Sequence, residues 1–346
     1  MQTRSPDVEE AGHVSVPLRS LLFVPGDSER KQAKALDSPA DALILDLEDS
    51  VARAQLPAAR VRVRELLLSR PLPVHHGAQR SSQSSQHPPP GSVAPSPRAS
   101  DRSPPQLWVR VNAPASGQLL DDLVAIMPGS PDGLVLPKVD CASQIAEVDH
   151  YLTALEASEG RIVGATRLIV IATETPKALL ALHTYPQVLA AHRSATARLA
   201  ALTWGCEDLA AQLGASANSD AAGVPTGPFR LARSWCLLTC AAIGVQAIDK
   251  VFVDFRDAAG LQRELADARR DGFTGKLAIH PDQLEAINSA FNPTEGELSR
   301  ARRIVAAFAA SPQAGVLSLD GQMIDRPHLL QARRLLNIAA REAGYS

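Results

Sequence analysis

Sulfur and aromatic side chains are scarce in this 346-residue chain, and long apolar runs are missing. Its four cysteines are too few for a disulfide framework. Cys236 and Cys240 lie four residues apart in an apolar helical run, which predicts buried free thiols. No stretch of about 18 apolar residues could span a bilayer, and the first residues, MQTRSPDVEEAGHVS, lack the apolar centre of a secretory signal. These absences predict a cytoplasmic protein that does not enter a membrane.

An excess of charge of one sign is missing as well. The chain has 35 Lys and Arg residues against 37 Asp and Glu residues, a formal net charge of −2. General nucleic-acid binding depends on a basic face that displaces counterions, so we exclude that class of partner. Hydrophobic residues make up 45% of the chain, which is enough for a globular protein with a sizeable core.

Residues 75–105 differ in composition from the rest of the chain. They are rich in Ser, Pro, Gln, Arg and Gly, and such a segment buries too little apolar surface to offset its ordering entropy. We interpret it as a disordered insertion in a loop, with no chemistry of its own. Residues 1–17 are interpreted as a flexible N-terminal tail.

Outside the insertion, short apolar runs alternate with segments that carry helix signals, such as the cap and first-turn proline of Thr175–Pro176. The runs are rich in Leu or β-branched residues, as strands buried on both faces are. They cover residues 18–26, 41–49, 107–112, 133–139, 167–174, 199–205, 250–255 and 276–281. This pattern predicts an α/β protein, a (β/α)8 TIM barrel over residues 18–292. An open doubly wound sheet is the alternative, but FVPGDSE after the first run lacks the Gly-rich dinucleotide pattern.

Residues 293–346 do not continue this repeat. Thr294 and Glu297 have the spacing of a capping box at the start of a helix that runs to about Ala310. Asp320–Gly321 between two short apolar runs predicts a hairpin, and an amphipathic helix follows. We expect these elements to form a C-terminal arm or lid.

Carboxylates dominate the carboxyl ends of the predicted strands, where barrel enzymes hold their reactive groups. The polar candidates there are Asp46, Glu48, Asp49, Arg110, Asn112, Lys138, Glu174, Glu207, Asp208, Asp254, Asp257 and His280. So many carboxylates would repel one another without a cation. Mg²⁺ suits them because it is a hard ion that takes one or two carboxylates and keeps water ligands, and no Cys/His spacing favours zinc.

A second interpretation of these residues stays open. Carboxylates at strand ends are also typical helix caps and solvated loop ends, and for Glu174 the spacing does not decide between the two. Lys138 could neutralise a neighbouring carboxylate in the barrel mouth rather than meet substrate. His280 is interpreted as a packed or loop-fixing histidine and is left out of the catalytic set.

Nine short motifs occur in order between about Leu18 and Ala340. They are RSLLFVPG, DLEDSV, WVRVN, LPKV, ATETP, WGCEDL, VFVDFRD, AIHPDQ and DGQMIDRP. Together they resemble the HpcH/HpaI aldolase/citrate lyase family, in particular its citrate lyase beta-subunit-like branch. The resemblance implies a (β/α)8 barrel, a Mg²⁺ ion, a CoA or acyl-carrier thioester ligand, and a homotrimer.

The resemblance also implies roles for residues of the barrel mouth. Glu174 of TETP and Asp208 of CEDL would bind the metal, and Arg110 of VRVN would bind the carbonyl and carboxylate oxygens of the substrate. Asp46 and Glu48 of DLED would hold metal-bound waters and orient Arg110.

Two further groups of residues follow from the same resemblance. Asp325 of the MID motif would be the acid/base at the thioester α-carbon, supplied by a neighbouring subunit; its position before a predicted helix also fits a simple helix cap. The FVPG loop with Pro25, and nearby basic residues such as Arg19 and Lys31, would bind the coenzyme.

The activity implied is Mg²⁺-dependent cleavage, or formation, of a β-hydroxyacyl thioester such as citryl-, malyl- or citramalyl-CoA, giving an acyl-CoA and a 2-oxo acid. Three alternatives stay open: a class II pyruvate aldolase acting on free hydroxy-oxo acids, a barrel that binds acyl-CoA without turnover, and an additional thioesterase reaction. The aldolases carry a histidine base after the second strand, where this chain has DLEDSV. The sequence does not distinguish CoA from an acyl-carrier protein.

Overall fold

The computed structural model of the protein describes residues 17–70, 104–221 and 223–344, with side chains as far as residue 340. All but the last residue of the predicted tail and nearly all of the predicted insertion lie outside these residues. The described residues fall into two compact units, a larger one within residues 19–291 and a smaller one made of residues 17–18 and 292–344.

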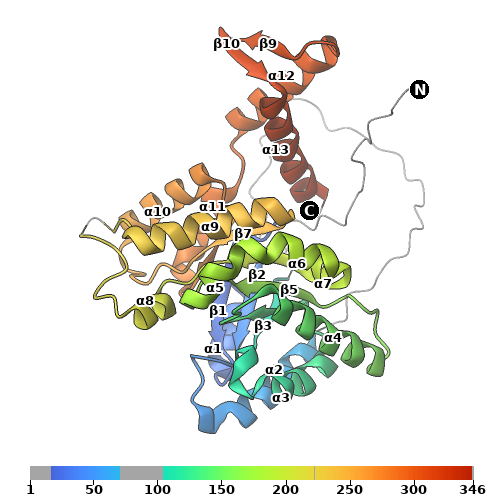
Figure 1. The fold of residues 1–346 in the computed structure, drawn as a ribbon, viewed down its shortest axis with the longest axis vertical. Coiled ribbons are helices and arrows are strands. Elements are labelled where there is room, and N and C mark those ends of the chain that lie inside the picture. Colours follow the sequence, from blue (N-terminus) through green and yellow to red (C-terminus); the bar gives the residue numbers. More distant parts are fainter. Residues whose placement is uncertain (1–16, 71–103, 222, 345–346) are drawn as a thin grey trace. The chain divides into compact units, whose positions relative to one another are not determined.

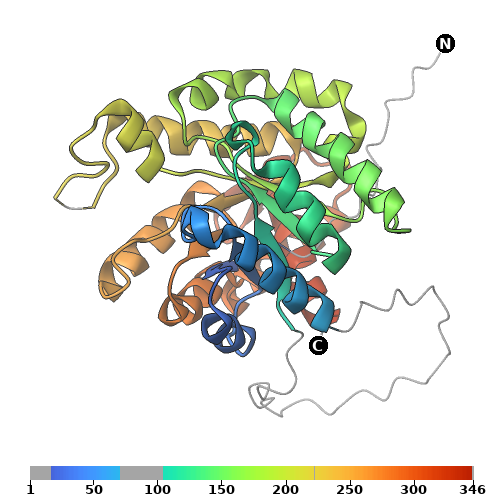
Figure 2. The same cartoon turned by 90° about the horizontal axis from the view of Figure 1, so that it is seen from below.

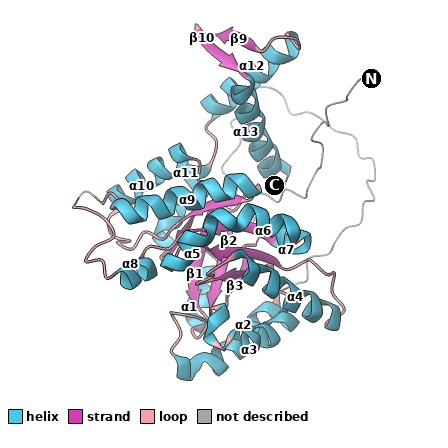
Figure 3. Ribbon diagram, viewed as in Figure 1, coloured by secondary structure: helices cyan, strands magenta, loops and turns pink. Residues whose placement is uncertain are grey.

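The larger unit is a closed barrel of eight parallel strands, each paired with its neighbours in sequence order (Figures 1 and 3). The predicted TIM-barrel fold is therefore confirmed. The strands are β1 (Ser20–Pro25), β2 (Ala42–Asp46), β3 (Gln106–Arg110), β4 (Gly133–Leu136), β5 (Arg167–Ile171), β6 (Leu199–Thr203), β7 (Gln246–Asp249) and β8 (Gly275–Ala278).

Helices surround these strands, as the view from below shows (Figure 2). They are α1 (Glu29–Leu36), α2 (Leu56–Ser69), α3 (Leu119–Ile126), α4 (Ala142–Ser158), α5 (Pro176–Ala181), α6 (Tyr185–Ala191), α7 (Arg193–Arg198), α8 (Glu207–Leu213), α9 (Gly227–Ile243), α10 (Ala258–Asp271) and α11 (Leu284–Phe291). The predicted start of α5 is confirmed, because the Thr175 hydroxyl accepts the backbone N–H of Ala178 and proline follows it.

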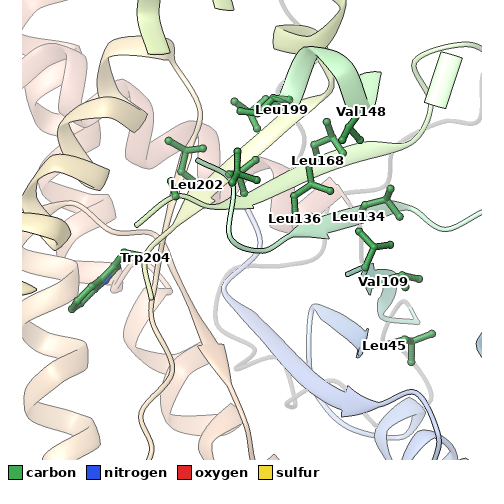
Figure 4. Packing of buried hydrophobic residues seen from close by; sticks show 14 of the residues in the cluster. Leu45, Val109, Leu134, Leu136, Val148, Leu168, Leu199, Leu202 and Trp204 are labelled. Atoms are coloured by element: carbon green, nitrogen blue, oxygen red, sulfur yellow. The ribbon is translucent and has the colours of Figure 1, made fainter. Parts of the chain in front are cut away.

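Burial on both faces explains why the strands read as continuous apolar runs. All five residues of β2 and all four of β4 and β8 are buried, as expected of strands that have helices on one side and the barrel interior on the other. Leu45, Val109, Leu134 and Leu168, which come from four successive strands, belong to one hydrophobic cluster (Figure 4). Cys236 and Cys240 are buried free thiols on α9, as predicted.

The prediction for the seventh strand is wrong. The strand is Gln246–Asp249, and KVFVDF (250–255) forms the loop that follows it. The β-branched and aromatic residues of that loop suggested a strand, but Val253 and Phe255 are exposed and the Phe255 ring stacks on His280. Consequently Asp254 and Asp257 do not end a strand, and the Asp257 carboxylate instead caps α10 by accepting the backbone N–H of Gly260.

The smaller unit contains the predicted helix, hairpin and second helix. Their bounds are α12 (Glu295–Ala310), β9 (Val316–Leu319), β10 (Gln322–Asp325) and α13 (Arg326–Gly344). Both halves of the capping box between Thr294 and Glu297 are present. Asp320 and Gly321 both have positive φ, 54° and 75°, as a two-residue hairpin turn requires. A small core of Ala301, Ile304, Phe308, Ile324 and Ala332 holds the unit together.

In the part of the chain that the structure describes, no helix is long and apolar enough to cross a membrane. This finding agrees with the short apolar runs of the sequence.

The close packing of β3 against β4 generates a prediction about stability. A Cβ atom at Gly133 would lie 2.2 Å from the Trp108 ring, whose side chain is buried, so Gly133→Ala forces this part of the barrel apart. We expect the free energy of unfolding to fall by about 1–3 kcal/mol, as for other overpacked cores. Urea denaturation followed by circular dichroism measures it.

Gly227→Ala is the matched control, because its added Cβ would meet nothing within 4 Å in the first turn of α9. Equal stability of both variants would contradict the packing argument.

Candidate active site

A cavity of about 980 Å³ opens at the carboxyl ends of the barrel strands. Its lining includes Asp46, Arg110, Glu174 and Asp208. Four of the residues predicted from the sequence for substrate and metal are therefore brought together, although they lie as far apart in the chain as residues 46 and 208.

Arg110 is held by a two-pronged ion pair with Asp46. Nε of Arg110 donates to Oδ1 and its second terminal nitrogen donates to Oδ2, both at 2.7 Å. The two residues are register partners at the ends of β2 and β3, so strand pairing itself places them side by side. The Asp46 carboxylate also accepts the backbone N–H groups of Glu48 and Ser50 at 3.0 Å.

This contact decides the charge state of Asp46. Burial would raise the pKa of the carboxyl, but the hydrogen bond and the charge of Arg110 outweigh burial and lower the pKa of Asp46 below its usual value. The guanidinium also lies 4.8 Å from the centre of the Phe23 ring. Arg110 is thus fixed in place, and only the N–H groups of its guanidinium that Asp46 does not occupy could bind an oxyanion.

Lys138 is surrounded by three carboxylates of the cavity mouth. Its ammonium donates to Glu48, and it lies 3.2 Å from Asp49 and 3.5 Å from Asp208. Burial raises the pKa of Glu48 to about 7, even though Arg110 and Lys138 both act to lower it. These contacts agree with the interpretation of Lys138 as a neutralising cation.

The backbone of Lys138 also contributes. Its φ of 51° lies in the left-handed region, which is unfavourable for a residue with a side chain. In this conformation its N–H donates to Oε2 of Glu174 at 2.5 Å while its ammonium reaches Glu48. One residue therefore connects the carboxylate after β5 with the loop after β2.

Glu174 and Asp208 are the two carboxylates predicted to bind metal, and both line the cavity. Glu174 is buried, and Asp208 is partly exposed in the first turn of α8. Burial raises the pKa of Glu174 to about 8; the charges of Asp208 and Glu48 act in the same direction, and the backbone N–H and the charge of Lys138 act against it. A cation would relieve this repulsion.

The donor set suits a hard ion with water ligands. No cluster of three or more His, Cys, Asp and Glu side chains that could hold a metal occurs in residues 17–70, 104–221 and 223–340. Two carboxylates beside an open cavity leave positions for water and for substrate oxygens, which is how Mg²⁺ is usually bound. Closed zinc sites need four protein ligands of another kind.

Gly205 allows Glu174 to reach this position. A Cβ atom at residue 205 would lie 2.9 Å from Cγ of Glu174, so a larger residue would displace the carboxylate. No sequence pattern indicates this role, because a glycine after a strand is also typical of an ordinary loop.

Of the three residues predicted to bind the coenzyme, two line the cavity and one does not. Pro25 and Lys31 line the cavity, together with Arg30 and Lys34 of α1. Arg19 is a correction: it precedes β1, at the other end of the strand from Pro25, where it forms a two-pronged ion pair with Asp41. Since β1 has six residues, its ends are about 17 Å apart, and Arg19 does not belong to this cavity.

Lys250 was not predicted as a cavity residue, because the seventh strand was expected to begin at this residue and not to end before it. Lys250 directly follows the true β7 and lines the cavity, and its ammonium is 3.1 Å from both oxygens of Glu264. His280 fixes a loop, as interpreted: Nδ1 of its ring accepts the backbone N–H of Asp282. Trp204 is buried, and its ring N–H donates to Asp249.

Asp325 belongs to the smaller unit, where it ends β10. Its carboxylate contacts the ring of His328 in the first turn of α13. Its surroundings are described within that unit alone.

The fold and the site define a class of protein: a TIM barrel with carboxylates suited to a metal ion at the opening of its cavity, next to an arginine, Arg110, that Asp46 holds in place. The family model for the HpcH/HpaI aldolase/citrate lyase family matches residues 19–75 and 92–281, and the chain belongs to this family.

Curated relatives are similar over nearly the whole chain. The mitochondrial citramalyl-CoA lyase of Mus musculus is 31% identical over 342 residues, which cover 95% of this chain and 88% of that protein. Citrate lyase subunit beta of Escherichia coli K12 is 32% identical over 324 residues, 93% of each chain.

Solved structures agree with these relatives. The protein CitE of Mycobacterium tuberculosis in complex with magnesium, acetoacetate and coenzyme A is 31% identical, with a TM-score of 0.65, over 93% of this chain and all of that one. The citrate lyase beta subunit of M. tuberculosis complexed with oxaloacetate and magnesium has a TM-score of 0.57 at 30% identity, over 80% and 97% of the chains. The resemblance stated from the motifs is confirmed.

The contacts of Lys138 generate a pH-dependent prediction. Lys138→Met keeps the apolar stem but leaves Glu48 with one cation fewer, and we expect a loss of about 1–3 kcal/mol in unfolding free energy at pH 8. At pH 5 the part of the loss that comes from Glu48 should disappear, because Glu48, with a pKa raised to about 7, is protonated in the folded protein. Only the contacts of Lys138 with Asp49 and Asp208 then contribute, so the loss should be smaller than at pH 8. Urea denaturation in EDTA at the two pH values measures this.

Lys177→Met is the control, because Lys177 pairs with Asp140 at 3.2 Å but is 74% exposed. Exposed pairs of this kind contribute about 0–1 kcal/mol. A Lys138→Met loss that is the same at pH 5 and pH 8 would remove Glu48 as its cause.

Proposed function

We propose that this protein is a Mg²⁺-dependent carbon–carbon lyase that cleaves, or forms, a β-hydroxyacyl thioester such as citryl-, malyl- or citramalyl-CoA. The products of cleavage are an acyl-CoA and a 2-oxo acid. The proposal is carried by one observation: Glu174 and Asp208 line the same cavity as Arg110 and Asp46, which form a two-pronged ion pair. The names of the relatives, citramalyl-CoA lyase and citrate lyase subunit beta, support it.

Glu174 and Asp208 would hold the ion, with the remaining positions open to water and substrate. When bound, Mg²⁺ supplies a Lewis acid for the carbonyl and carboxylate oxygens of the 2-oxo acid half. Lys138 keeps the three carboxylates that it contacts from repelling one another, and its backbone N–H holds one oxygen of Glu174.

Arg110 would bind the same oxygens of the 2-oxo acid half. A guanidinium presents donors in a plane that matches a carboxylate, and Asp46 holds it with little freedom to lose on binding. Asp46 and Glu48 act through Arg110, because both contact it directly, at 2.7 Å and 3.0 Å. Arg110 thereby stabilises the negative charge that develops when the carbon–carbon bond breaks.

Arg30, Lys31 and Lys34 would bind the coenzyme. Three basic side chains of α1 at the rim of the cavity give a positive surface suited to phosphate groups. Pro25, at the end of β1, lies in the wall next to them.

Asp325 would exchange the proton at the α-carbon of the thioester. Cleavage leaves a carbanion equivalent at this carbon, and a carboxyl group in hydrogen-bond reach can protonate it. We propose further that the protein is a homotrimer and that a neighbouring subunit supplies Asp325.

The free-acid pyruvate aldolase is less well supported. The loop after β2 contributes Asp46, Glu48 and Asp49 rather than a histidine base, and the basic rim on α1 would have no phosphate to bind in a free acid.

A turnover assay with malyl-CoA, citramalyl-CoA and citryl-CoA, each with Mg²⁺ and with EDTA, tests the proposed reaction. Mg²⁺-dependent release of acetyl-CoA and a 2-oxo acid from one of them supports the lyase and names its substrate. Turnover of free hydroxy-oxo acids, with none of the three thioesters, would favour the aldolase.

The metal assignment predicts the behaviour of Asp208→Asn. This variant keeps the size of the side chain but removes one of two anionic ligands, so we expect Mg²⁺-dependent turnover to fall at least about 100-fold. Mg²⁺ affinity, measured by calorimetry, should weaken at least about tenfold with the melting temperature little changed. Asp121→Asn is the control, since Asp121 is a surface carboxylate of α3, 66% exposed; wild-type Mg²⁺ affinity in Asp208→Asn would exclude Asp208 as a ligand.

Mg²⁺ affinity should also depend on pH. Because the pKa of Glu174 is raised to about 8 and only the carboxylate binds metal, protons compete with the ion below that pH. We expect the affinity to increase close to tenfold per pH unit between pH 6 and pH 8 and to level off above. Calorimetric titration across this range checks it, and an affinity independent of pH would contradict the assignment of Glu174.

A further inference from the structure

Asp325 has a partner that the sequence analysis did not consider. It is the last residue of β10, and His328 is the third residue of α13. Oδ1 of Asp325 lies 2.5 Å from Nδ1 of His328, and the backbone N–H of Asp325 donates to the same ring nitrogen at 3.2 Å. Both side chains are partly exposed, by 33% and 43%.

The short contact requires a proton between the two side chains. An ionised carboxylate and an unprotonated ring nitrogen are both acceptors and would repel at this distance. In one arrangement the carboxyl O–H donates to Nδ1, which then faces the backbone N–H as an acceptor too. In the other the imidazole Nδ1–H donates to the carboxylate and no longer accepts the backbone N–H. In both arrangements Asp325 and His328 together hold one proton that can reside on either residue.

We propose that Asp325 and His328 act as a two-residue acid/base unit, in which His328 positions the Asp325 carboxyl and restores its proton. This inference rests on the proposed function, because it assumes that Asp325 exchanges a proton with the thioester α-carbon.

The Asp325 O–H bond breaks, its proton forms the new C–H bond with the electron pair left on the α-carbon by cleavage, and the carboxylate remains. The exposed imidazole then takes a proton from solvent, which restores the shared proton. In the condensation direction each transfer is reversed.

Three arginines of this unit have partners other than Asp325 and His328. Arg300 donates to Gln322, Arg302 to Glu295 and Arg303 to Asp320. The contact of Asp325 with His328 also places a ring acceptor on a backbone N–H at the start of α13, as half a capping box does. A purely structural role must therefore be separated from a chemical one.

His328→Asn separates the two roles. The amide oxygen of Asn can occupy the place of Nδ1 and accept the backbone N–H, but it cannot carry the proton. His328→Val removes both functions. Asp325→Asn removes the carboxyl that the proposed function requires.

The experiment uses the full-length protein with Mg²⁺ and acetyl-CoA in D2O, and NMR follows deuterium entering the acetyl methyl group. Steady-state kcat and KM are measured with the thioester substrate. For His328→Asn we expect exchange and kcat about 10- to 100-fold lower, with KM, Mg²⁺ affinity and melting temperature close to wild type.

The outcomes separate the two proposals. Wild-type exchange and kcat in His328→Asn, with exchange lost in Asp325→Asn, would overturn the role of His328 and leave that of Asp325 in place. A lower melting temperature in His328→Val alone, with normal exchange in His328→Asn, would reduce His328 to a helix cap. Exchange that persists in Asp325→Asn, or is absent from the wild type, would overturn both roles.

Discussion

Charge balance at the barrel mouth is the constraint on which the rest of the site depends. Asp46, Glu48, Asp49, Glu174 and Asp208 cannot all stay ionised near one another without cations, and burial makes their repulsion stronger. Arg110 and Lys138 supply two positive charges from within the chain. Burial, with a smaller contribution from the neighbouring carboxylates, still raises the pKa values of Glu174 and Glu48. A divalent ion would add further positive charge beside them.

Arg110 and Lys138 make different contacts because their charged groups differ in shape. The guanidinium of Arg110 forms a planar fork with Asp46, which leaves its direction fixed. The ammonium of Lys138 is a point charge that can face three carboxylates at once. An exchange of the two residue types would lose both properties, because lysine cannot form the fork and arginine cannot sit compactly among the carboxylates.

Much of the fold could be read from the sequence, since buried parallel strands are short apolar runs and seven of the eight were located. The seventh was misplaced because Val251, Phe252 and Val253 have a higher strand propensity than the true strand QAID, and tertiary pairing overrode that propensity. Strand ends brought Asp46, Arg110, Glu174 and Asp208 to one cavity. Arg19 could not be excluded from sequence, because a basic residue near the FVPG loop does not reveal at which end of its strand it lies. The contact between Asp325 and His328 depends on how a hairpin meets a helix, which no motif records.

The register pairing of Asp46 with Arg110 has a consequence for the folding of the barrel. Because the fork joins residues directly opposite each other on β2 and β3, a slip of one residue between these strands would turn one partner away from the cavity. A barrel with that error would lose the arginine that lines its cavity. Arg110 and Asp46 can therefore face the cavity together only when β2 and β3 are correctly aligned.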